Sequence, residues 1–562
     1  MCIRFTCIVF IFGIFSISCN NTRETAGTNS LEVDSLFKEW GPDAPGVAVA
    51  ILKDSSVLFQ KGFGMANLEY SIPITSSSVF DIASLSKQFC AFAIALLAHE
   101  ERLSLDDNIR IYIPELPDFG HDITIRHLIH HTSGLRDWPA TLALAGWQME
   151  DVISFKQIIT MVKNQKELNF APGTEYSYSN TGYNLLSEIV NRITGQSFNE
   201  WTKENIFMPL SMNSTHFCHD HQCIKKNRAQ GYTWRDSSYI ALSNNLTAMG
   251  SSSLHTTLED LIKWIVNFQT GKTGGKEVLA LMEDQGVLKH GDTISYAFGQ
   301  HVESYKGTMR FQHTGAWAGF RTILSRFPEK GLSIVLLSNI GSFDATGMAN
   351  KLADIFLQEE QEQNVEVSEK ARTITVPENL LRRFEGYYRL KDGAIVDVYI
   401  KEQKLFFRHD IRPSGNESFP LLAISNSSFT SPTNGARIFF HDDKSREHAS
   451  GLSLALSGVT RDGIFINFYD PSTTDLGEFS GKYSSDELQT EYFISTQSGI
   501  LVVEHHRNEE IMLAPLAEDL FVSGTWYFSP VLAVRDDTGR VTGLRIGAGR
   551  ARNILFRKIK NN

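Results

Sequence analysis

Apolar and polar residues follow two different patterns along the chain, and the change comes near residue 356. Before it, apolar residues at helical spacing occupy residues 85–101, 182–194 and 258–268. The alternating, β-branched pattern of strands occupies residues 46–60, 319–326 and 333–338. Because strands stand at both ends with helices between them, we predict one domain over residues 31–356, in which a sheet built from both ends packs against a helical insertion.

The second part of the chain is rich in strand patterns and nearly lacks helical ones. Residues 357–375 include an acidic, Gln-rich stretch without a core pattern, so we predict a linker there. Short alternating runs separated by Gly and Asp follow, for example residues 395–400 and 501–504. They predict two all-β modules, each a small barrel or sandwich, over residues 376–470 and 471–562.

These two modules resemble copies of each other. The Phe-x-Gly-x-Tyr run of residues 384–388 recurs at residues 479–483, an offset of 95 residues. Phe429 recurs as Phe521, and Gly451-Leu452 as Gly543-Leu544, both at an offset of 92 residues. A steady offset of this kind indicates that one module arose by duplication of the other.

The first residues resemble an export signal. Arg4 supplies a positive charge, and the apolar run of residues 7–15 is too short to span a bilayer. The segment that ends at Cys19 resembles a bacterial lipoprotein box, although Ser16 stands where an aliphatic residue is usual. We therefore predict a signal peptide over residues 1–19 and a periplasmic protein of a bacterium, attached to the membrane through lipidated Cys19. A simply cleaved signal is the alternative.

Composition narrows the class of partner. The 562 residues predict two to four domains, and the shares of hydrophobic (42%) and charged (21%) residues are typical of a soluble globular protein. The net charge of -11 argues against a nucleic acid partner, because phosphate binding requires a basic face.

Three cysteines lie beyond the signal segment. Cys90 lies in an apolar helical pattern and is predicted to be buried. Cys218 and Cys223 are close enough for a small-loop disulfide in an oxidising compartment. The His- and Cys-containing run over residues 216–223 lacks the second, separated ligand pair that structural zinc sites usually have. We predict a loop there, and neither a metal nor another cofactor for the protein.

The first candidate for chemistry is Ser84-Leu-Ser-Lys87, at the start of an apolar helical pattern. Residues three apart share one face of a helix, so the Lys87 amine is placed to accept the proton of the weakly nucleophilic Ser84 hydroxyl. The partial positive charge of a helix start favours a developing oxyanion. Ser35-Leu-Phe-Lys38 has the same spacing, and we interpret it as the polar face of an ordinary helix.

Two further segments follow in order. In Tyr178-Ser-Asn180, a tyrosine beside a cationic lysine can relay a proton below its usual pKa range, and the Asn180 amide can bind a substrate amide. The alternative interpretation of this segment is a strand-to-helix turn with a buried aromatic ring. The run His313-Thr314-Gly315-Ala316 leads into the terminal strand pair, where an edge strand with a glycine lets substrate lie against the backbone.

Lys272-Thr-Gly274 competes with His313-Thr-Gly315 for the same role. It is a literal Lys-Thr-Gly, but it lies in a Gly-rich loop between helical patterns. It also lacks the first glycine of a phosphate-binding loop, because Val266 stands there. We therefore choose His313.

Together with residues 125–135 (IRHLIHHTSGL), these segments resemble the serine β-lactamase-related family of the penicillin-binding-protein superfamily, which includes class C β-lactamases, DD-peptidases, D-aminopeptidases and esterases. The resemblance covers about residues 31–356. It implies an α/β (α+β) sandwich of a mainly antiparallel sheet and a helical lobe, with the active site between them. The all-β repeats resemble the barrel modules of D-aminopeptidase-like members, and restriction of access to the cleft, or assembly, is our hypothesis for their role.

The resemblance also assigns site residues. It implies that Ser84 is the nucleophile, that Lys87 handles its proton, and that Tyr178 passes a proton to the leaving group. Asn180 would contact the substrate amide, and the strand residues His313, Thr314 and Gly315 would bind substrate. The oxyanion hole would be the backbone N–H groups of Ser84 and Ala316. Residues 130–133 match a segment of the family that we interpret as structural.

One departure bears on the substrate. True β-lactamases and DD-peptidases carry lysine at the position of His313, and a histidine is mostly neutral near pH 7. This weakens the case for antibiotic hydrolysis and is compatible with the D-aminopeptidase and esterase branches. Arg321, a few residues further on, is the candidate to restore a contact with a substrate carboxylate.

The leading hypothesis is therefore an exported serine hydrolase that forms an acyl-enzyme on small peptide, amide or ester substrates, with D-amino-acid peptides or cell-wall fragments first. A broad esterase or weak β-lactamase is one alternative. A catalytically silent protein that binds peptidoglycan or a partner is the other. The four residues Ser84, Lys87, Tyr178 and Asn180 count against it, because a silent descendant has no chemical need for all of them.

Overall fold

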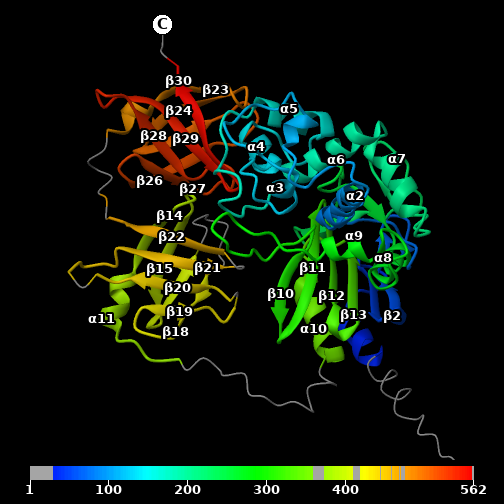
Figure 1. Cartoon of the computed structure of the whole chain (residues 1–562). Coiled ribbons are helices and arrows are strands. Elements are labelled where there is room, and N and C mark those ends of the chain that lie inside the picture. Colours follow the sequence, from blue (N-terminus) through cyan, green and yellow to red (C-terminus); the bar gives the residue numbers. More distant parts are fainter. Residues whose placement is uncertain are drawn as a thin grey trace, which may run out of the picture.

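The chain forms one mixed domain followed by two strand-built bodies, which stand one above the other beside it (Figure 1). The computed structural model describes residues 30–559, apart from 358–372, 409–417, 434, 444, 457–458, 468 and 470–474. The predicted signal peptide with Cys19, and most of the predicted linker, lie outside the described residues. Among the described residues, no helix is long and apolar enough to cross a membrane.

The first domain is built on a six-stranded antiparallel sheet of strand order β10-β11-β12-β13-β1-β2. Its strands are β1 (Val47–Lys53), β2 (Ser56–Phe63), β10 (His301–Tyr305), β11 (Thr308–Trp317), β12 (Phe320–Phe327) and β13 (Leu332–Ser338). Strand β1 is buried from Val47 to Leu52 and pairs with β13 along its whole length. The predicted sheet from both ends of the domain is confirmed, because a strand that is apolar on both faces needs neighbours in the middle of a sheet.

Helices cover both faces of this sheet. On one face lies α10 (Ala345–Leu357), whose apolar side packs in the same core as Val47 and Val49. On the other lies the predicted helical lobe, which contains α2 (Lys87–His99), α3 (Ile125–Ile129), α4 (Trp138–Leu144), α5 (Phe155–Asn164), α6 (Asn180–Thr194), α7 (Phe198–Thr202), α8 (Leu258–Thr270) and α9 (Gly275–Leu281). The turns of the domain are η1 (Ala83–Ser86), η2 (Ile109–Ile111), η3 (Lys203–Phe207) and η4 (Pro328–Lys330).

Three small sheets complete the domain. They are the pairs β3 (Met65–Asn67) with β4 (Ile72–Pro73) and β7 (Gly231–Arg235) with β8 (Ser238–Leu242), and the trio β5 (Phe80–Asp81), β9 (Leu254–Thr256) and β6 (His216–Phe217). Helix α2 lies at the centre of the lobe and is buried from Lys87 to Leu97. Its sequence carries no polar stripe beyond the first two residues, so every face can pack against apolar neighbours.

The first of the two all-β bodies follows α11 (Glu378–Leu381) and η6 (Arg382–Phe384). Its strands are β14 (Gly386–Leu390), β15 (Ile395–Lys401), β16 (Lys404–Arg408), β17 (Phe419–Pro420), β18 (Leu422–Ala423), β19 (Ser428–Thr430), β20 (Arg437–His441), β21 (Gly451–Leu456) and β22 (Val459–Ile466). The sheet begins with β17 and ends with β18, and only Leu421 separates these two strands. The sheet therefore curls until its two edges meet in one stretch of chain.

The second all-β body is a closed barrel of eight strands that follows η8 (Leu476–Phe479). Its strands are β23 (Gly481–Ser485), β24 (Thr490–Gln497), β25 (Ile500–Glu504), β26 (Ile511–Ala517), β27 (Leu520–Ser523), β28 (Val531–Arg535), β29 (Val541–Ala548) and β30 (Ala551–Lys558). If β17 and β18 count as one strand, both bodies have the same strand order. The repeated motif also makes the same bond in each: Tyr388 donates to Phe384 O (2.9 Å) and Tyr483 to Phe479 O (2.8 Å).

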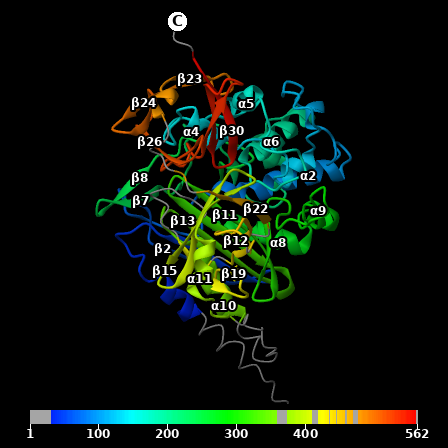
Figure 2. The ribbon, with the colours of Figure 1, turned by 90° about the vertical axis from the view of Figure 1, so that its left-hand side faces the viewer.

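The second barrel packs directly on the helical lobe, with β30 beside α4 (Figure 2). The preceding strand β29 contacts α4 as well. Ala140 and Leu144 of α4 belong to the hydrophobic core of the barrel, and Tyr492 donates a hydrogen bond to Leu144 O (2.9 Å). Beside them, Arg136 of the first domain forms an ion pair with Glu487 of the barrel, and both side chains are buried. Burial raises the pKa of Glu487 and Arg136 opposes the rise.

Glu487→Ala is expected to destabilise the docked protein by about 3–5 kcal/mol, because it leaves the Arg136 guanidinium buried without its partner. Urea unfolding of the full chain measures the loss. The matched control is Arg507→Ala, which removes a more exposed ion pair to Asp151 (2.8 Å) across the same interface and is expected to cost at most about 1 kcal/mol. Equal effects of the two changes would contradict the prediction.

Three cysteines are free in the described part of the chain. Cys90 is buried in α2, as its apolar surroundings predict. Cys218 and Cys223 do not form the disulfide that their spacing allows. The Cys218 thiol instead donates to the carbonyl of Asp220 (3.0 Å), which closes a tight turn.

Candidate active site

Ser84 lies on the short turn η1, between β5 and α2, rather than inside a continuous α-helix. Ala83, immediately before it, has φ +47°, which few residues other than glycine adopt. The turn is held by Asp81, whose carboxylate accepts from Ala83 N (2.8 Å). As a result Ser84 is partly exposed while Ala83, Leu85 and Ser86 are buried. A strained backbone of this kind is common where a reactive side chain is held in place.

Lys87 begins α2, and its side chain is completely buried. Its amine donates to the side-chain oxygen Oδ1 of Asn180 (2.7 Å) and to Ser251 O (2.8 Å). Burial lowers the pKa of Lys87 well below its usual value, nearby Arg550 lowers it further, and Asp137 opposes both. Burial thus shifts Lys87 toward the neutral amine, which is the form that can act as a base.

Tyr178 links the lysine and the serine. Its side chain lies close enough to that of Ser84 to interact with it, and the Lys87 amine lies 4.8 Å from the centre of its ring. Burial raises the pKa of Tyr178, although the nearby Ser84 side chain opposes the rise. The sequence predicts that a cationic lysine lowers the pKa of Tyr178, and that prediction is wrong. The reason is that burial disfavours both charged forms, the ammonium of Lys87 and the phenolate of Tyr178.

His131 holds the Tyr178 segment in place. Its carbonyl accepts from Ser177 N (2.9 Å), its Nδ1 accepts from Ser179 N (3.1 Å), and its ring lies 4.3 Å from that of Tyr178. Thr132 O accepts from Gly173 N (2.7 Å) at the start of the same segment. These contacts hold the backbone of the Tyr178 segment in place, in line with our interpretation of residues 130–133 as structural.

Strand β11 passes close to the turn that carries Ser84. Its pairing with β10 ends at Gln312, and from His313 to Trp317 the described pairing is with β12 alone. A Cβ at Gly315 would lie only 2.1 Å from the Ile82 carbonyl oxygen, so a side chain there would push the strand away. Glycine is required because strand and turn approach so closely.

His313 is buried and both of its ring nitrogens have partners. Nδ1 donates to Thr314 O (2.6 Å), so Nε2 accepts from the Tyr296 hydroxyl (3.2 Å). Burial, with His301 and Lys87 nearby, lowers the pKa of His313 well below its usual value. The position that is lysine in true β-lactamases therefore carries a neutral side chain here.

Four of the predicted substrate-binding residues line a hollow of about 210 Å³ beside this strand: Thr314, Gly315, Ala316 and Arg321. Its other wall is the segment that leads into α10, residues 343–346. The Arg321 guanidinium donates to the Phe320 carbonyl (2.8 Å). The cluster of Ser84, Lys87, Tyr178 and Asn180 lies on the lobe side of the sheet. The Arg321 side chain lies on the other side, because it alternates with Phe320 and Thr322, which face the lobe, and shares the side of Ile323 and α10.

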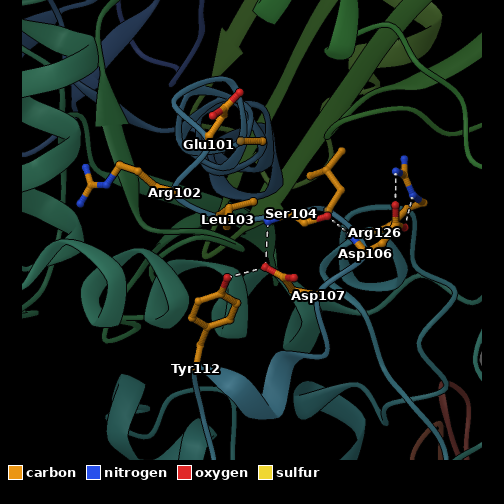
Figure 3. A pocket seen from close by; sticks show the side chains of 10 residues that line it. Glu101, Arg102, Leu103, Ser104, Asp106, Asp107, Tyr112 and Arg126 are labelled. Carbon is orange, nitrogen blue, oxygen red and sulfur yellow. Dashed lines mark hydrogen bonds and ion pairs between the residues drawn. The ribbon is translucent and has the colours of Figure 1, made fainter.

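Two other features, a larger hollow and the Lys272-Thr-Gly274 run, lie away from these groups. A larger hollow, of about 600 Å³, follows the end of α2 (Figure 3). Several of its polar groups bind one another: the Tyr112 hydroxyl and the backbone N of Ser104 both donate to Asp107, and Arg126 binds Asp106. The Lys272-Thr-Gly274 run lies between α8 and α9, as its loop pattern predicts. Within the described residues no group of three His, Cys, Asp or Glu side chains could hold a metal.

Sequence reasoning missed several residues of the cluster. Asp137 accepts hydrogen bonds from Asn180, and Ser251 supplies a carbonyl to Lys87. His301 lies 5.3 Å from His313, ring centre to ring centre. Arg550 reaches the cluster from the second barrel and forms an ion pair with Asp137 (2.9 Å). No local pattern marks Arg550, because its position depends on how the barrel docks.

A serine on a strained turn, a buried lysine one turn further, a tyrosine beside both and an open strand edge define a serine hydrolase of the penicillin-binding-protein type. Residues 33–356 match the family model described as Beta-lactamase, and the chain belongs to that family. The family and the fold predicted from the sequence are both confirmed.

Similarity to individual proteins extends beyond the first domain. A D-aminopeptidase of Gluconobacter oxydans is 26% identical over 540 residues, which cover 92% of this chain and 96% of that protein. Penicillin-binding protein 4* of Bacillus subtilis is 26% identical over 427 residues, 71% of this chain and 94% of that protein. An octameric penicillin-binding protein homologue from Pyrococcus abyssi shares the fold, with a TM-score of 0.53 at 23% identity over 79% of this chain and 100% of that one.

Proposed function

We propose that the protein hydrolyses amide bonds in peptides that carry D-amino acids, cell-wall fragments among them, through an acyl-enzyme on Ser84. The observation that carries the proposal is the completely buried Lys87 amine, which is bonded to Asn180 and lies 4.8 Å from the ring centre of Tyr178. The substrate class is supported by similarity to D-aminopeptidases, which extends over 92% of the chain and so includes both all-β bodies.

In the proposed mechanism Lys87 starts neutral and Tyr178 starts protonated. The Ser84 oxygen attacks the substrate carbonyl, and the serine proton passes to the Lys87 amine, which becomes an ammonium. The carbonyl oxygen takes up negative charge, which the backbone N–H groups of Ser84 and Ala316 stabilise. The neutral Lys87 amine can accept the serine proton directly, because it does not first have to lose a proton of its own.

Collapse of the intermediate breaks the C–N bond. The leaving nitrogen takes a proton from the Tyr178 hydroxyl, which takes one from the Lys87 ammonium, so both groups return to their starting forms. The acyl group is now an ester of Ser84. Water attacks this ester with Lys87 as base, and the products are a carboxylic acid and free Ser84.

We further propose that Arg321 binds a carboxylate of the substrate. Its guanidinium is half-buried in the hollow on the α10 side of β11, whereas His313, on the lobe side of the same strand, is neutral and offers no charge. Arg321→Ala is expected to raise KM for a carboxylate-bearing substrate about 10-fold to 100-fold, the loss of a charge-assisted hydrogen bond, with kcat nearly unchanged. The control is a neutral amide substrate of the same length, whose KM should not change. An equal loss for both substrates would assign Arg321 a structural role.

The function is tested by intact-protein mass spectrometry and a substrate panel. Wild type and Ser84→Ala are incubated with a fluorophosphonate and, separately, with a penicillin. A single fluorophosphonate adduct on wild type alone supports the activated serine. Turnover of D-alanyl and D-phenylalanyl amides, but not their L-isomers, supports the proposed substrate class. Hydrolysis of short esters alone would indicate a broad esterase. Absence of any adduct would refute the acyl-enzyme and favour a binding protein.

Export is also part of the proposal. It rests on the charged and apolar pattern of residues 1–19 and on Cys19 within a lipoprotein-like segment. Fractionation of bacteria that express the full chain tests it. Wild type in the membrane fraction and Cys19→Ser in the periplasm would support lipidation, and wild type in the cytoplasm would contradict export.

A further inference from the structure

The hairpin between β29 and β30 of the second barrel reaches the cluster around Ser84. Arg550, at its tip, forms an ion pair with the Asp137 carboxylate (2.9 Å), and its guanidinium carbon lies 5.1 Å from the centre of the Tyr178 ring. The backbone of the tip is fixed as well, because Arg550 O accepts from Asp137 N (3.2 Å) and from the Asn169 side chain (2.9 Å). The barrel therefore contributes a charged side chain to the site.

Asp137 is completely buried, so its charge needs compensation. Its two oxygens accept from Asn180, one from the backbone N (2.7 Å) and the other from the side-chain Nδ2 (3.2 Å). Both of these donors are neutral. The positive charge in direct contact with Asp137 is that of Arg550. The adjacent Arg136 is occupied by Glu487 of the same barrel.

The orientation of the Asn180 amide follows from this contact. Because Nδ2 donates to Asp137, the amide oxygen Oδ1 faces the other way, and it accepts from the Lys87 amine (2.7 Å). A continuous series of contacts thus leads from Arg550 through Asp137 and Asn180 to Lys87.

We propose that Arg550 is a positioning residue of the active site, which neutralises Asp137 and thereby fixes the Asn180 amide against the Lys87 amine. The inference rests on the proposed function, because it takes Lys87 as the base of the reaction. It also gives the second barrel a definite role in the reaction. The hydrolase domain without the barrel has all of the reacting groups but lacks the charge that balances Asp137.

The charges around Lys87 predict how the loss of Arg550 would change the pKa of Lys87. Asp137 raises the pKa of Lys87, whereas burial and Arg550 lower it. Six other titratable side chains lie close to Lys87: those of Cys90, Tyr178, Tyr183, His131, His301 and His313. Burial lowers the pKa of each of the three histidines, so their imidazoles are neutral near pH 7. Without Arg550 the negative charge of Asp137 acts unopposed and stabilises the ammonium form. The pKa of Lys87 then rises, and a higher pH is needed for the neutral, active form.

The test is the rate of Ser84 labelling by a fluorophosphonate as a function of pH, on the full chain. In Arg550→Ala the pH at which labelling reaches half its maximum is expected to rise by about one to two pH units, with labelling below the wild-type midpoint about 10-fold to 100-fold slower. In Asp137→Asn the same midpoint is expected to fall, because the group that stabilises the ammonium is gone. The double variant is expected to return close to wild type, and Arg550→Lys to stay there.

The matched control is Arg545→Ala on β29, which removes an ion pair to Glu167 (2.8 Å) across the same interface but leaves Arg550 in place. Its midpoint should equal that of wild type. Unchanged midpoints in Arg550→Ala and Asp137→Asn would overturn the proposal, and so would equal shifts in Arg550→Ala and Arg545→Ala. If Arg550→Ala does not fold, Asp137→Asn and Arg550→Lys carry the test. Failure of wild type to be labelled would instead refute the proposed function.

Discussion

Ser84→Ala is expected to lower kcat for an amide substrate by about 10⁴-fold to 10⁶-fold, because no other group can form the acyl-enzyme. Residual turnover would come from substrate binding and the oxyanion hole alone. The fold should be kept, since the Ser84 side chain is partly exposed and the turn is held by the backbone of Ala83 and by Asp81. Steady-state hydrolysis of a D-amino-acid amide measures the effect.

The chain offers a matched control for this change. Ser35-Leu-Phe-Lys38 has the same Ser-x-x-Lys spacing, and Ser35 is exposed, with its hydroxyl bonded to Glu32 O (2.7 Å). Ser35→Ala is expected to keep wild-type kcat and KM. Substantial activity in Ser84→Ala would mean that another residue is the nucleophile.

Lys87→Met is expected to lower kcat by about 10²-fold to 10⁴-fold, the range that general-base catalysis contributes. Methionine fills much of the volume of the lysine side chain without its amine, so the core of α2 should remain packed. Hydrolysis of the same amide substrate measures the loss, and thermal unfolding checks the fold. Activity near wild type would exclude Lys87 as the base.

Lys87→Arg separates the role of a base from that of a positive charge. A guanidinium stays protonated at any working pH, so this variant keeps a cation and loses the base. It is expected to be as inactive as Lys87→Met. In wild type the protonated lysine is the inactive form, so kcat/KM should fall as pH falls through the lowered pKa of Lys87. A Lys87→Arg enzyme with high activity would show that charge, not proton transfer, matters at this position.

The sequence by itself determined the parts whose pattern is local. The buried run of β1 predicts a central strand, and its partner β13 comes from the other end of the domain because that end carries the matching apolar run. The Ser84–Lys87 spacing predicts neighbouring side chains whether the turn is η1 or α-helical. The repeated Phe-x-Gly-x-Tyr predicts two related bodies, and each tyrosine makes the same bond in its own copy.

The protonation state of each reacting group was decided by the tertiary structure alone. A pKa depends on how much water and which charges surround a group, and those surroundings come from distant segments. Tyr178 illustrates this, because the sequence predicts a lowered pKa and burial raises it. Arg550 illustrates it further, since 413 residues separate it from Asp137 along the chain, yet the two side chains are in contact. Local periodicity fixes which side chains share a face, whereas the docking of a whole barrel decides which charge reaches the base.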